Sequence, residues 1–293
     1  MFSERFITND PTQAHMFFIP ITWLQLEEMG IYANADDYVR HIIKEYPHWN
    51  RSKGVDHFLV TCCDAGKMFS ERVPLNNYMR LSCSARNDDM HHKHHLISIP
   101  QMRLPFFPPV RGGYEIQNRT ILAFWACHEN YPASLNDWDF WDECPGQEKF
   151  KASKYCICDG SSHITRMCIT ESIHFGCVPV ILYEDYELPF GDILDWTKFS
   201  VIINKDDAYR VEQILEAIPD SKFSELHNNI RKVQRHFHGN SSFGGRHKQY
   251  DVLHQWHLHA NSAFRGHDKP YDVFHMIMYE LWLRNLARSF SDS

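Results

Sequence analysis

The sequence predicts an α/β protein built from two doubly wound domains. Three observations carry this prediction: apolar runs alternate with helical patterns near the amino terminus, residues 91–113 are rich in proline and glycine, and a second alternating pattern begins at Arg119. The predicted domains cover residues 1–113 and 114–270, and residues 271–293 form a helix that packs back. A ligand is expected in the cleft between the two domains.

The first domain begins with the order strand, helix, strand. Residues 14–20 (AHMFFIP) indicate a buried strand, residues 22–46 have mainly helical spacing, and residues 57–63 (HFLVTCC) indicate a second strand. Asp64 follows that strand in a polar turn. Because ligands bind at the carboxyl ends of strands in open parallel sheets, Asp64 is a candidate site residue. Capping of the loop is the structural alternative for its carboxylate.

Residues 91–113 separate the two alternating patterns. They read HHKHH, then LISIP and LPFFPPVRGG, and this density of proline and glycine predicts an extended loop or an interdomain connector. The histidine cluster could bind a metal ion, but adjacent histidines point in different directions and no carboxylate is near in the sequence. We therefore expect a solvated loop at this cluster.

The second domain is predicted to contain four strands, with helices between several of them. The strands are expected at residues 120–126 (TILAFWA), 154–158 (KYCIC), 177–182 (CVPVIL) and 199–203 (FSVII). Helical stretches are expected at residues 163–175 and 206–218. Such an order of strands and helices is typical of a parallel sheet.

The turn Asp159-Gly160-Ser161-Ser162 joins a predicted strand to the predicted helix of residues 163–175. The amino end of a helix carries free N–H groups and a partial positive charge, so it can bind phosphate. Gly160, Ser161 and Ser162 permit close backbone approach and helix capping, which makes this turn a candidate site for a diphosphate. Its spacing matches neither the Walker motif nor the GxGxxG motif.

Glu171 lies further along the same predicted helix. A carboxylate at this place can accept two hydrogen bonds from ribose hydroxyls, whereas a solvated helix residue is the structural alternative. Gly176 is expected to end the helix, because glycine readily adopts the left-handed conformation of helix ends. The predicted strand of residues 177–182 follows at once.

Composition limits the classes of function. The chain has 293 residues, of which 43% are hydrophobic, and a net charge of −7, so no nucleic-acid partner is expected, because neutralising phosphates needs a basic surface. No run of about 18 apolar residues and no signal-like apolar core occurs, so the chain is expected to be soluble as written, or a fragment without an upstream anchor. Sequons at Asn50, Asn118 and Asn240 permit a secretory glycoprotein.

The stretch GCVPVILYEDYELPFGDILDWTKFSVII at residues 176–203 resembles the C-terminal core of exostosin-like glycosyltransferases, especially their plant members. The resemblance extends along most of the chain. Further matching residues are Asp10-Pro11, Ala14-His15, Phe17-Phe18, Pro20, Trp49-Asn50-Arg51-Ser52, Gly54, Asp56-His57-Phe58, Asp64, Arg119, Leu122-Ala123-Phe124, Lys232-Val233-Gln234-Arg235-His236-Phe237 and Tyr271-Asp272-Val273-Phe274-His275-Met276-Ile277. Together these motifs are specific to the family.

The resemblance implies the GT-B architecture, in which two Rossmann-like domains face each other across a donor cleft. It also implies an inverting transfer from a nucleotide sugar, usually a UDP-sugar, to a cell-wall or extracellular polysaccharide, with no metal ion or other cofactor. Such a reaction needs a base for the acceptor hydroxyl, and positive groups or N–H dipoles at the leaving diphosphate. Kinship further implies a location in the Golgi lumen and an N-terminal membrane anchor.

Roles for individual residues follow from the resemblance, position by position. Glu171 is the candidate for binding ribose, and Ser161 and Ser162, with the backbone around Gly160, are the candidates for binding the diphosphate. Arg119 opens a strand of the donor domain, where it is a candidate for contacting phosphate. A structural ion pair is the alternative role for that guanidinium.

Asp64, at the mouth of the acceptor domain, is the candidate catalytic base. Three nearby positions depart from the family pattern: Cys168 stands where the family usually has Arg, Cys63 replaces a His, and WACHE (125–129) lacks a family glycine. Arg166 precedes Cys168 by two residues, which places the two side chains roughly 200° apart around a helix. Arg166 can therefore replace the family's Arg only if the helix begins or turns differently at this point. These departures support an alternative, a catalytically inactive member that binds a glycan or a partner transferase of the family.

The chain contains nine cysteines. The region of Cys156 and Cys158, and also Cys177, fall at positions where the family that the chain resembles often has cysteine. A disulfide fits an oxidising lumen. Buried thiols that pack as small apolar groups are the alternative.

Overall fold

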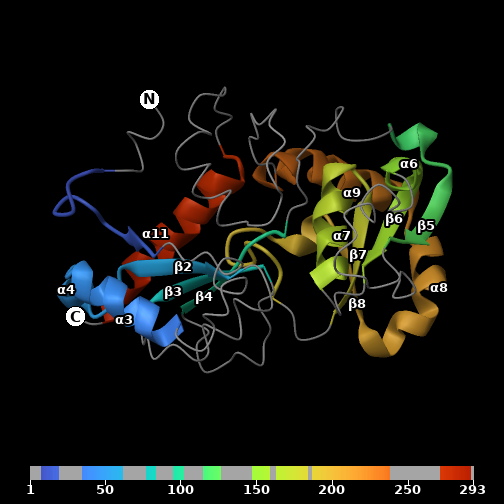
Figure 1. Cartoon of the computed structure of the whole chain (residues 1–293). Coiled ribbons are helices and arrows are strands. Elements are labelled where there is room, and N and C mark those ends of the chain that lie inside the picture. The colour runs from blue at the N-terminus through green and yellow to red at the C-terminus, as the bar shows by residue number, and fades with distance from the viewer. Residues whose placement is uncertain are drawn as a thin grey trace, which may run out of the picture. The chain divides into compact units, whose positions relative to one another are not determined.

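A computed structural model gives the structure of the chain. It describes residues 8–19, 35–61, 77–83, 95–101, 115–126, 147–158, 163–183, 187–237 and 271–291. These residues form two compact units, each with its own parallel sheet (Figure 1). The first unit contains the described residues up to Ile99 and those from Phe274 onward, and the second contains the described residues from Pro100 to Phe237 together with Tyr271–Val273. The last helix of the chain therefore belongs to the first unit.

Four parallel strands form the sheet of the first unit. In their order across the sheet they are β1 (Phe17–Phe18), β2 (His57–Thr61), β3 (Met79–Ser82) and β4 (Leu96–Ser98). Among the described residues of this unit, the helices are α3 (Ala35–Glu45), α4 (Trp49–Ser52) and α11 (Val273–Ser291). Every residue of β2 is buried, as is typical of a parallel strand covered on both faces. Among the helices of the described ranges, none has the length and apolar character needed to cross a membrane.

Asp56 organises the turn that leads from α4 into β2. Its Oδ2 accepts hydrogen bonds from Nε and Nη2 of Arg51 at 3.0 and 2.7 Å, and its Oδ1 lies 2.7 Å from Nδ1 of His57. The Arg51 guanidinium also donates to the carbonyl oxygens of Pro11 and Ala14 at 3.2 and 3.0 Å. This cluster lies at the amino end of β2, and it joins three segments of the first unit.

Four parallel strands also form the sheet of the second unit. In their order across the sheet they are β5 (Ile121–Trp125), β6 (Ser153–Cys158), β7 (Val178–Tyr183) and β8 (Val201–Asn204). The helices are α6 (Gln147–Ala152), α7 (His163–His174), α8 (Val211–Glu216) and α9 (Asp220–Val233). Short 3₁₀ turns occur at Ile116–Asn118, Trp196–Lys198, Lys205–Arg210 and Gln234–Phe237. Helix α7 connects β6 to β7 and packs against both strands (Figure 1).

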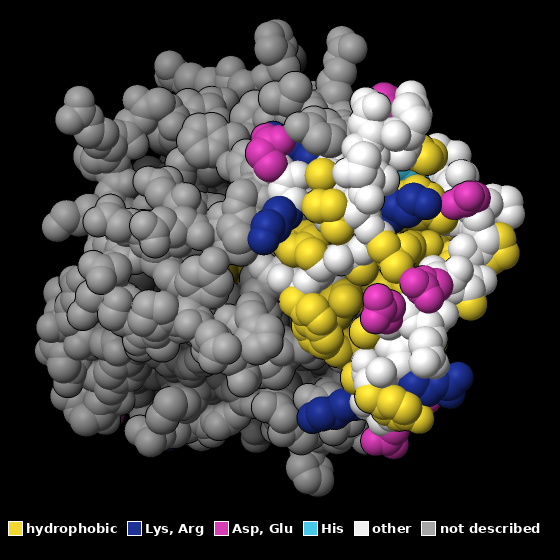
Figure 2. Space-filling view, turned by 90° about the vertical axis from the view of Figure 1, so that its right-hand side faces the viewer, with side chains coloured by type: hydrophobic (Ala, Val, Ile, Leu, Met, Phe, Trp, Pro, Cys, Tyr) yellow, Lys and Arg dark blue, Asp and Glu magenta, His cyan; other side chains and the backbone are white. Residues whose placement is uncertain are grey.

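The two edges of the second sheet leave large apolar side chains exposed. Ile121 and Trp125 on β5 are 38% and 44% exposed, and Ile202 on β8 is 41% exposed, whereas the central strand β6 is almost completely buried. Figure 2 shows one face of this unit, where hydrophobic side chains reach the surface between acidic and basic ones.

An aromatic cluster accounts for several of the motifs that follow β7. Phe190, Trp196 and Phe199 are buried and lie in contact with one another or with Phe237, with ring centroids 4.8–5.9 Å apart. The indole N–H of Trp196 donates to the carbonyl oxygen of Pro189 at 2.9 Å. The LPF, LDWTKFS and KVQRHF stretches therefore meet in one core, and this packing explains why these residue types occur together.

The predicted elements agree with the structure for the long patterns and differ for the short ones. Strands β2 and β5–β8 lie within two residues of their predicted bounds, and α7 occupies residues 163–174. The prediction of an extended loop for residues 91–113 is wrong at β4, whose three residues are buried and pair with β3. Strand β3 and helices α6 and α9 were not predicted. The predicted domain boundaries near residues 113 and 270 lie outside the described residues and stay predictions.

Candidate functional site

Helix α7 carries the residues that the sequence predicts to bind a nucleotide sugar. It begins at His163, after the turn that follows the carboxyl end of β6. That turn, with Gly160, Ser161 and Ser162, lies outside the described residues, as does Asp64. Arg166 lies on α7, but its side chain is outside the described part of the structure. The predicted roles of these residues therefore stay predictions.

Glu171 lies on α7, eight residues after His163, which corresponds to roughly 12 Å along the helix axis. Its side chain is partly exposed, whereas its neighbours Thr170 and Ser172 are 3% and 0% exposed. Side chains on a helix lean toward the amino end, so the carboxylate lies closer to that end than its Cα does. Glu171 therefore stands at the boundary between core and solvent, where a carboxylate can meet a ligand.

The carboxyl end of α7 is fixed by a glycine and by a side-chain cap. Gly176 has φ of 70°, its N–H donates to the carbonyl of Ile173 at 3.1 Å, and the N–H of Cys177 donates to the carbonyl of Ser172 at 2.8 Å. This pattern is a Schellman motif, and it confirms the predicted end of the helix at Gly176. The amide of Gln234 donates to the Ile173 carbonyl at 2.9 Å, which ties this helix end to the end of α9.

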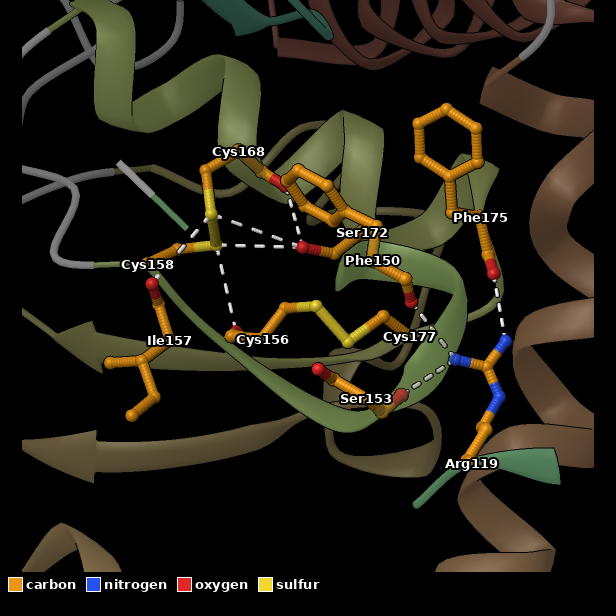
Figure 3. Close-up of a disulfide and its surroundings, with 10 residues drawn as sticks. All are labelled: Arg119, Phe150, Ser153, Cys156, Ile157, Cys158, Cys168, Ser172, Phe175 and Cys177. Atoms are coloured by element: carbon orange, nitrogen blue, oxygen red, sulfur yellow. Dashed lines mark hydrogen bonds between the residues drawn. A yellow bond between two sulfur atoms is a disulfide. The ribbon is translucent and has the colours of Figure 1, made fainter. Parts of the chain in front are cut away.

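Arg119 is buried at the amino edge of the second sheet (Figure 3). Its Nη1 donates to the carbonyl oxygens of Phe150 and Ser153 at 3.0 and 2.6 Å, and its Nη2 donates to the carbonyl of Phe175 at 2.8 Å. Only 3% of the residue is exposed, and this burial lowers the pKa of Arg119 to about 10. The guanidinium thus joins the starts of β5 and β6 to the end of α7.

These contacts give Arg119 a structural role in the described structure. The sequence analysis left open a phosphate contact or an ion pair, and the observed partners are main-chain carbonyls. Ligands of parallel α/β sheets bind beyond the carboxyl ends of the strands, whereas Arg119 lies at the amino ends. The contacts therefore give no support to the predicted binding of phosphate, which stays a prediction.

Two buried disulfides connect β6 to the elements that follow it (Figure 3). Cys156 pairs with Cys177 at a Cα–Cα distance of 5.9 Å, and Cys158 pairs with Cys168 at 5.8 Å. All four residues are at most 1% exposed. The sequence left a disulfide and buried thiols open for this region, and the structure contains disulfides. Cys168, where the resemblance leads us to expect Arg, is bonded to Cys158 in this chain, and the sequence analysis did not predict that pairing.

His227 of α9 is a buried residue whose ring is not hydrogen-bonded. It is 2% exposed, and neither ring nitrogen has a hydrogen-bonding partner in the described part of the chain. Burial lowers the pKa of His227 to about 4, and the nearby positive charges of Arg119 and Arg231 act in the same direction. The folded protein therefore holds this imidazole neutral at neutral pH.

This lowered pKa predicts a loss of stability in mild acid. In the unfolded chain His227 binds a proton below its usual pKa of about 6.5, whereas in the folded protein it binds one only below about pH 4. Between these two pH values the unfolded state binds more protons, so the free energy of unfolding falls as the pH decreases. We expect the lowered pKa of His227 to reduce the free energy of unfolding by about 2 kcal/mol at pH 5 and to leave it unchanged at pH 7.5. Urea unfolding of the wild type and of His227→Leu at both pH values measures it.

The control is Asn228→Leu, which introduces the same residue at an exposed neighbouring position of α9. When the pH decreases from 7.5 to 5, the free energy of unfolding of His227→Leu is expected to fall by about 2 kcal/mol less than that of the wild type. The free energy of unfolding of Asn228→Leu is expected to change with pH as the wild type does. An identical pH dependence in all three proteins would contradict the assignment.

Comparison with known proteins identifies relatives over most of the chain. A model of the family described as the Exostosin GT47 domain matches residues 1–218. A probable glycosyltransferase of Arabidopsis thaliana is 30% identical over 96% of this chain and 55% of its own length, and a second is 29% identical over 96% and 61%. A probable glucuronosyltransferase of Oryza sativa subsp. japonica is 26% identical over 75% of this chain and 61% of its own length. The chain thus spans little more than half the length of these relatives.

Proposed function

Because the chain belongs to the exostosin GT47 family, we propose that it is an inverting glycosyltransferase that moves a sugar from a nucleotide sugar to a cell-wall or extracellular polysaccharide. The proposed carrier is UDP. The proposal includes the GT-B architecture and a location in the Golgi lumen, which kinship implies. The presence of two parallel α/β sheets in one chain supports that architecture.

The observation that carries the proposal is the position of α7. The helix begins directly after the turn at the carboxyl end of β6, which is the edge where parallel sheets bind nucleotides. Its first turn offers backbone N–H groups and the positive end of the helix dipole to a diphosphate. In the proposed complex Gly160, Ser161 and Ser162 surround the diphosphate at this end.

Glu171 supplies the second contact of the proposed donor site. Its partly exposed carboxylate, which leans toward the amino end of α7, accepts hydrogen bonds from the two ribose hydroxyls. Diphosphate and ribose thus bind along one helix, in the order in which a nucleotide presents them. Sugar transfer then needs a base at the acceptor hydroxyl, and Asp64 remains the proposed base.

No metal ion is part of the proposed mechanism, because the helix dipole and N–H groups stabilise the leaving diphosphate. Two further elements come from kinship, a glycan acceptor and assembly with other members of the family. Because the rice relative is described as a probable glucuronosyltransferase, UDP-glucuronic acid belongs in any screen of donors. Hydrolysis of labelled UDP-sugars without an acceptor reports which donor the site accepts.

Calorimetric titration with UDP in the presence of EDTA tests the proposed donor site. Wild-type protein is expected to bind UDP, and Glu171→Ala is expected to bind it roughly 10- to 100-fold more weakly, because hydrogen bonds to a charged group are lost. Glu171→Gln, which retains the shape but not the charge, is expected to lie between the two. Glu216→Ala removes an equally charged, exposed side chain from α8 and serves as the control.

Two outcomes would contradict the proposal. Wild-type affinity in Glu171→Ala would show that this carboxylate does not bind the nucleotide, and the absence of any UDP binding by the wild type would remove the donor site altogether. The second outcome favours the alternative function, an inactive family member that binds a glycan or a partner transferase. The observation that favours this alternative is the disulfide of Cys168, because the resemblance leads us to expect an Arg at that position.

A further inference from the structure

The Cys158–Cys168 disulfide joins the last residue of β6 to the second turn of α7. Both residues are buried, at 1% and 0% exposure. The sulfur of Cys158 lies 3.6 Å from the Ser172 hydroxyl, and the sulfur of Cys168 lies 3.8 Å from the carbonyl oxygen of Ile157. The bond is thus packed between strand and helix (Figure 3).

The position of this bond differs from that of the other anchors of α7. The Gly176 turn, the Gln234 cap and the Arg119 hydrogen bond to Phe175 all hold the carboxyl end of the helix. Of the contacts named here, the Cys158–Cys168 bond lies nearest to the amino end of α7, because it joins the second turn of the helix to the last residue of β6. Cys168 lies five residues after His163, roughly 7.5 Å along the axis, so the bond fixes the first turn through a rigid helix.

From this arrangement we propose that Cys158 and Cys168 are positioning residues of the donor site. Their disulfide holds the amino end of α7 at the carboxyl end of β6, so that its N–H groups are in place for the diphosphate of the nucleotide. The inference rests on the proposed function, since the diphosphate is the group positioned. Glu171, the proposed ribose contact, lies three residues after Cys168, on the side of α7 that the Gly176 turn and the Gln234 cap also hold.

The second disulfide provides a matched control. Cys156–Cys177 also starts on β6 and is equally buried, but it leads to the residue before β7, at the carboxyl end of α7. The two bonds close loops with sequence separations of 21 and 10, and the longer loop predicts the larger contribution to stability. If only stability mattered, removal of Cys156–Cys177 would have the larger effect.

The test compares Cys158→Ala/Cys168→Val with Cys156→Ala/Cys177→Val, two pairs of apolar replacements. Affinities for UDP and for uridine are measured by ligand-observed NMR, and thermal unfolding is recorded for each protein. Without Cys158–Cys168, UDP is expected to bind about tenfold more weakly, the equivalent of roughly one charge-assisted hydrogen bond, while uridine affinity stays within twofold. Without Cys156–Cys177, Tm is expected to fall at least as far as it does without Cys158–Cys168. The ratio of UDP to uridine affinity is expected to stay unchanged in that variant.

Peptide mapping of the non-reduced wild type, which needs no variant, is the first step. It is expected to show the Cys158–Cys168 pair, and two free thiols there would overturn the inference. If Cys158→Ala/Cys168→Val does not fold, the wild type is titrated with a dithiol reductant instead. Each protein disulfide that opens gains two electrons and two protons, and one dithiol is oxidised to its own disulfide. UDP affinity is then compared with the fraction of each pair opened, and a loss that follows Cys156–Cys177 alone would overturn the inference.

The proposed function and this inference fail in different ways. Failure of the wild type to bind UDP overturns both. Binding of UDP by the wild type with an unchanged ratio of UDP to uridine affinity in Cys158→Ala/Cys168→Val overturns the inference alone. An equal loss of UDP and uridine affinity also overturns it, because a general loss of structure would then explain the result.

Discussion

Replacement of Arg119 by methionine is expected to destabilise the second unit by about 4 kcal/mol. The guanidinium is 3% exposed and donates hydrogen bonds to three main-chain carbonyls, from residues 31, 34 and 56 positions away in the sequence. Methionine fills much of the space but leaves these acceptors without their donor, and each unsatisfied buried group costs about 1–3 kcal/mol. Denaturant unfolding, fitted to separate transitions because the chain forms two compact units, measures the loss.

The matched control is Arg210→Met. Arg210 is half exposed and lies 3.8 Å from the carboxylate of Asp207, so its loss is expected to change stability by less than about 1 kcal/mol. A loss below about 1 kcal/mol in Arg119→Met would show that the carbonyls find other donors. UDP affinity of folded Arg119→Met, measured at low temperature, also tests the phosphate contact predicted from the sequence. A loss of UDP affinity larger than that of Glu171→Ala would support that prediction.

The second large effect is expected at Gly54, in the turn between α4 and β2. Gly54 has φ of 94°, a conformation that residues with a side chain rarely adopt, and an added Cβ would overlap the indole ring of Trp49. That ring cannot move freely, because it packs against His57 with ring centroids 4.9 Å apart. Backbone strain and overpacking together predict a loss of about 3–4 kcal/mol for Gly54→Ala.

Gly191→Ala is the control for this variant. An added Cβ at Gly191 would lie 3.1 Å from the carbonyl oxygen of Leu188, which is a tight contact but not an overlap, and the backbone there is not in the left-handed region. We expect Gly191→Ala to change stability by about 1 kcal/mol or less. Unfolding curves of both variants should show that Gly54→Ala affects the transition of the first unit. Equal stability of Gly54→Ala and wild type would contradict the account of the turn.

Long apolar patterns made much of the fold predictable. Strands β2, β6 and β7 are buried on both faces, so they appear in the sequence as continuous apolar runs, and Gly176 marks the end of α7 through its positive φ. Strands β3 and β4 were missed because they are four and three residues long, and β3 contains Arg80 and Ser82. Such short segments become strands through pairing with a neighbour, which no local pattern reveals.

Helix α9 was missed although its sequence contained a usable signal. Phe223, Leu226 and Ile230 recur at helical spacing and are all buried, and Pro219 immediately precedes the helix. A count of apolar spacing over residues 219–233 would therefore have found it. The prediction for Arg119 could not have been improved in the same way, because its three carbonyl partners are unremarkable in the sequence.

The sequence by itself determined the two α/β blocks, the helix that carries Glu171, and membership of the exostosin GT47 family. These features depend on local periodicity and on motifs, which a linear chain displays directly. Only the tertiary structure decided that Arg119 binds main-chain carbonyls, that Cys168 pairs with Cys158, and that His227 is buried with no hydrogen bond to its ring from the described residues. Each of these roles arises between residues that folding brings together, and a side chain's hydrogen bonds and burial exist only after that step.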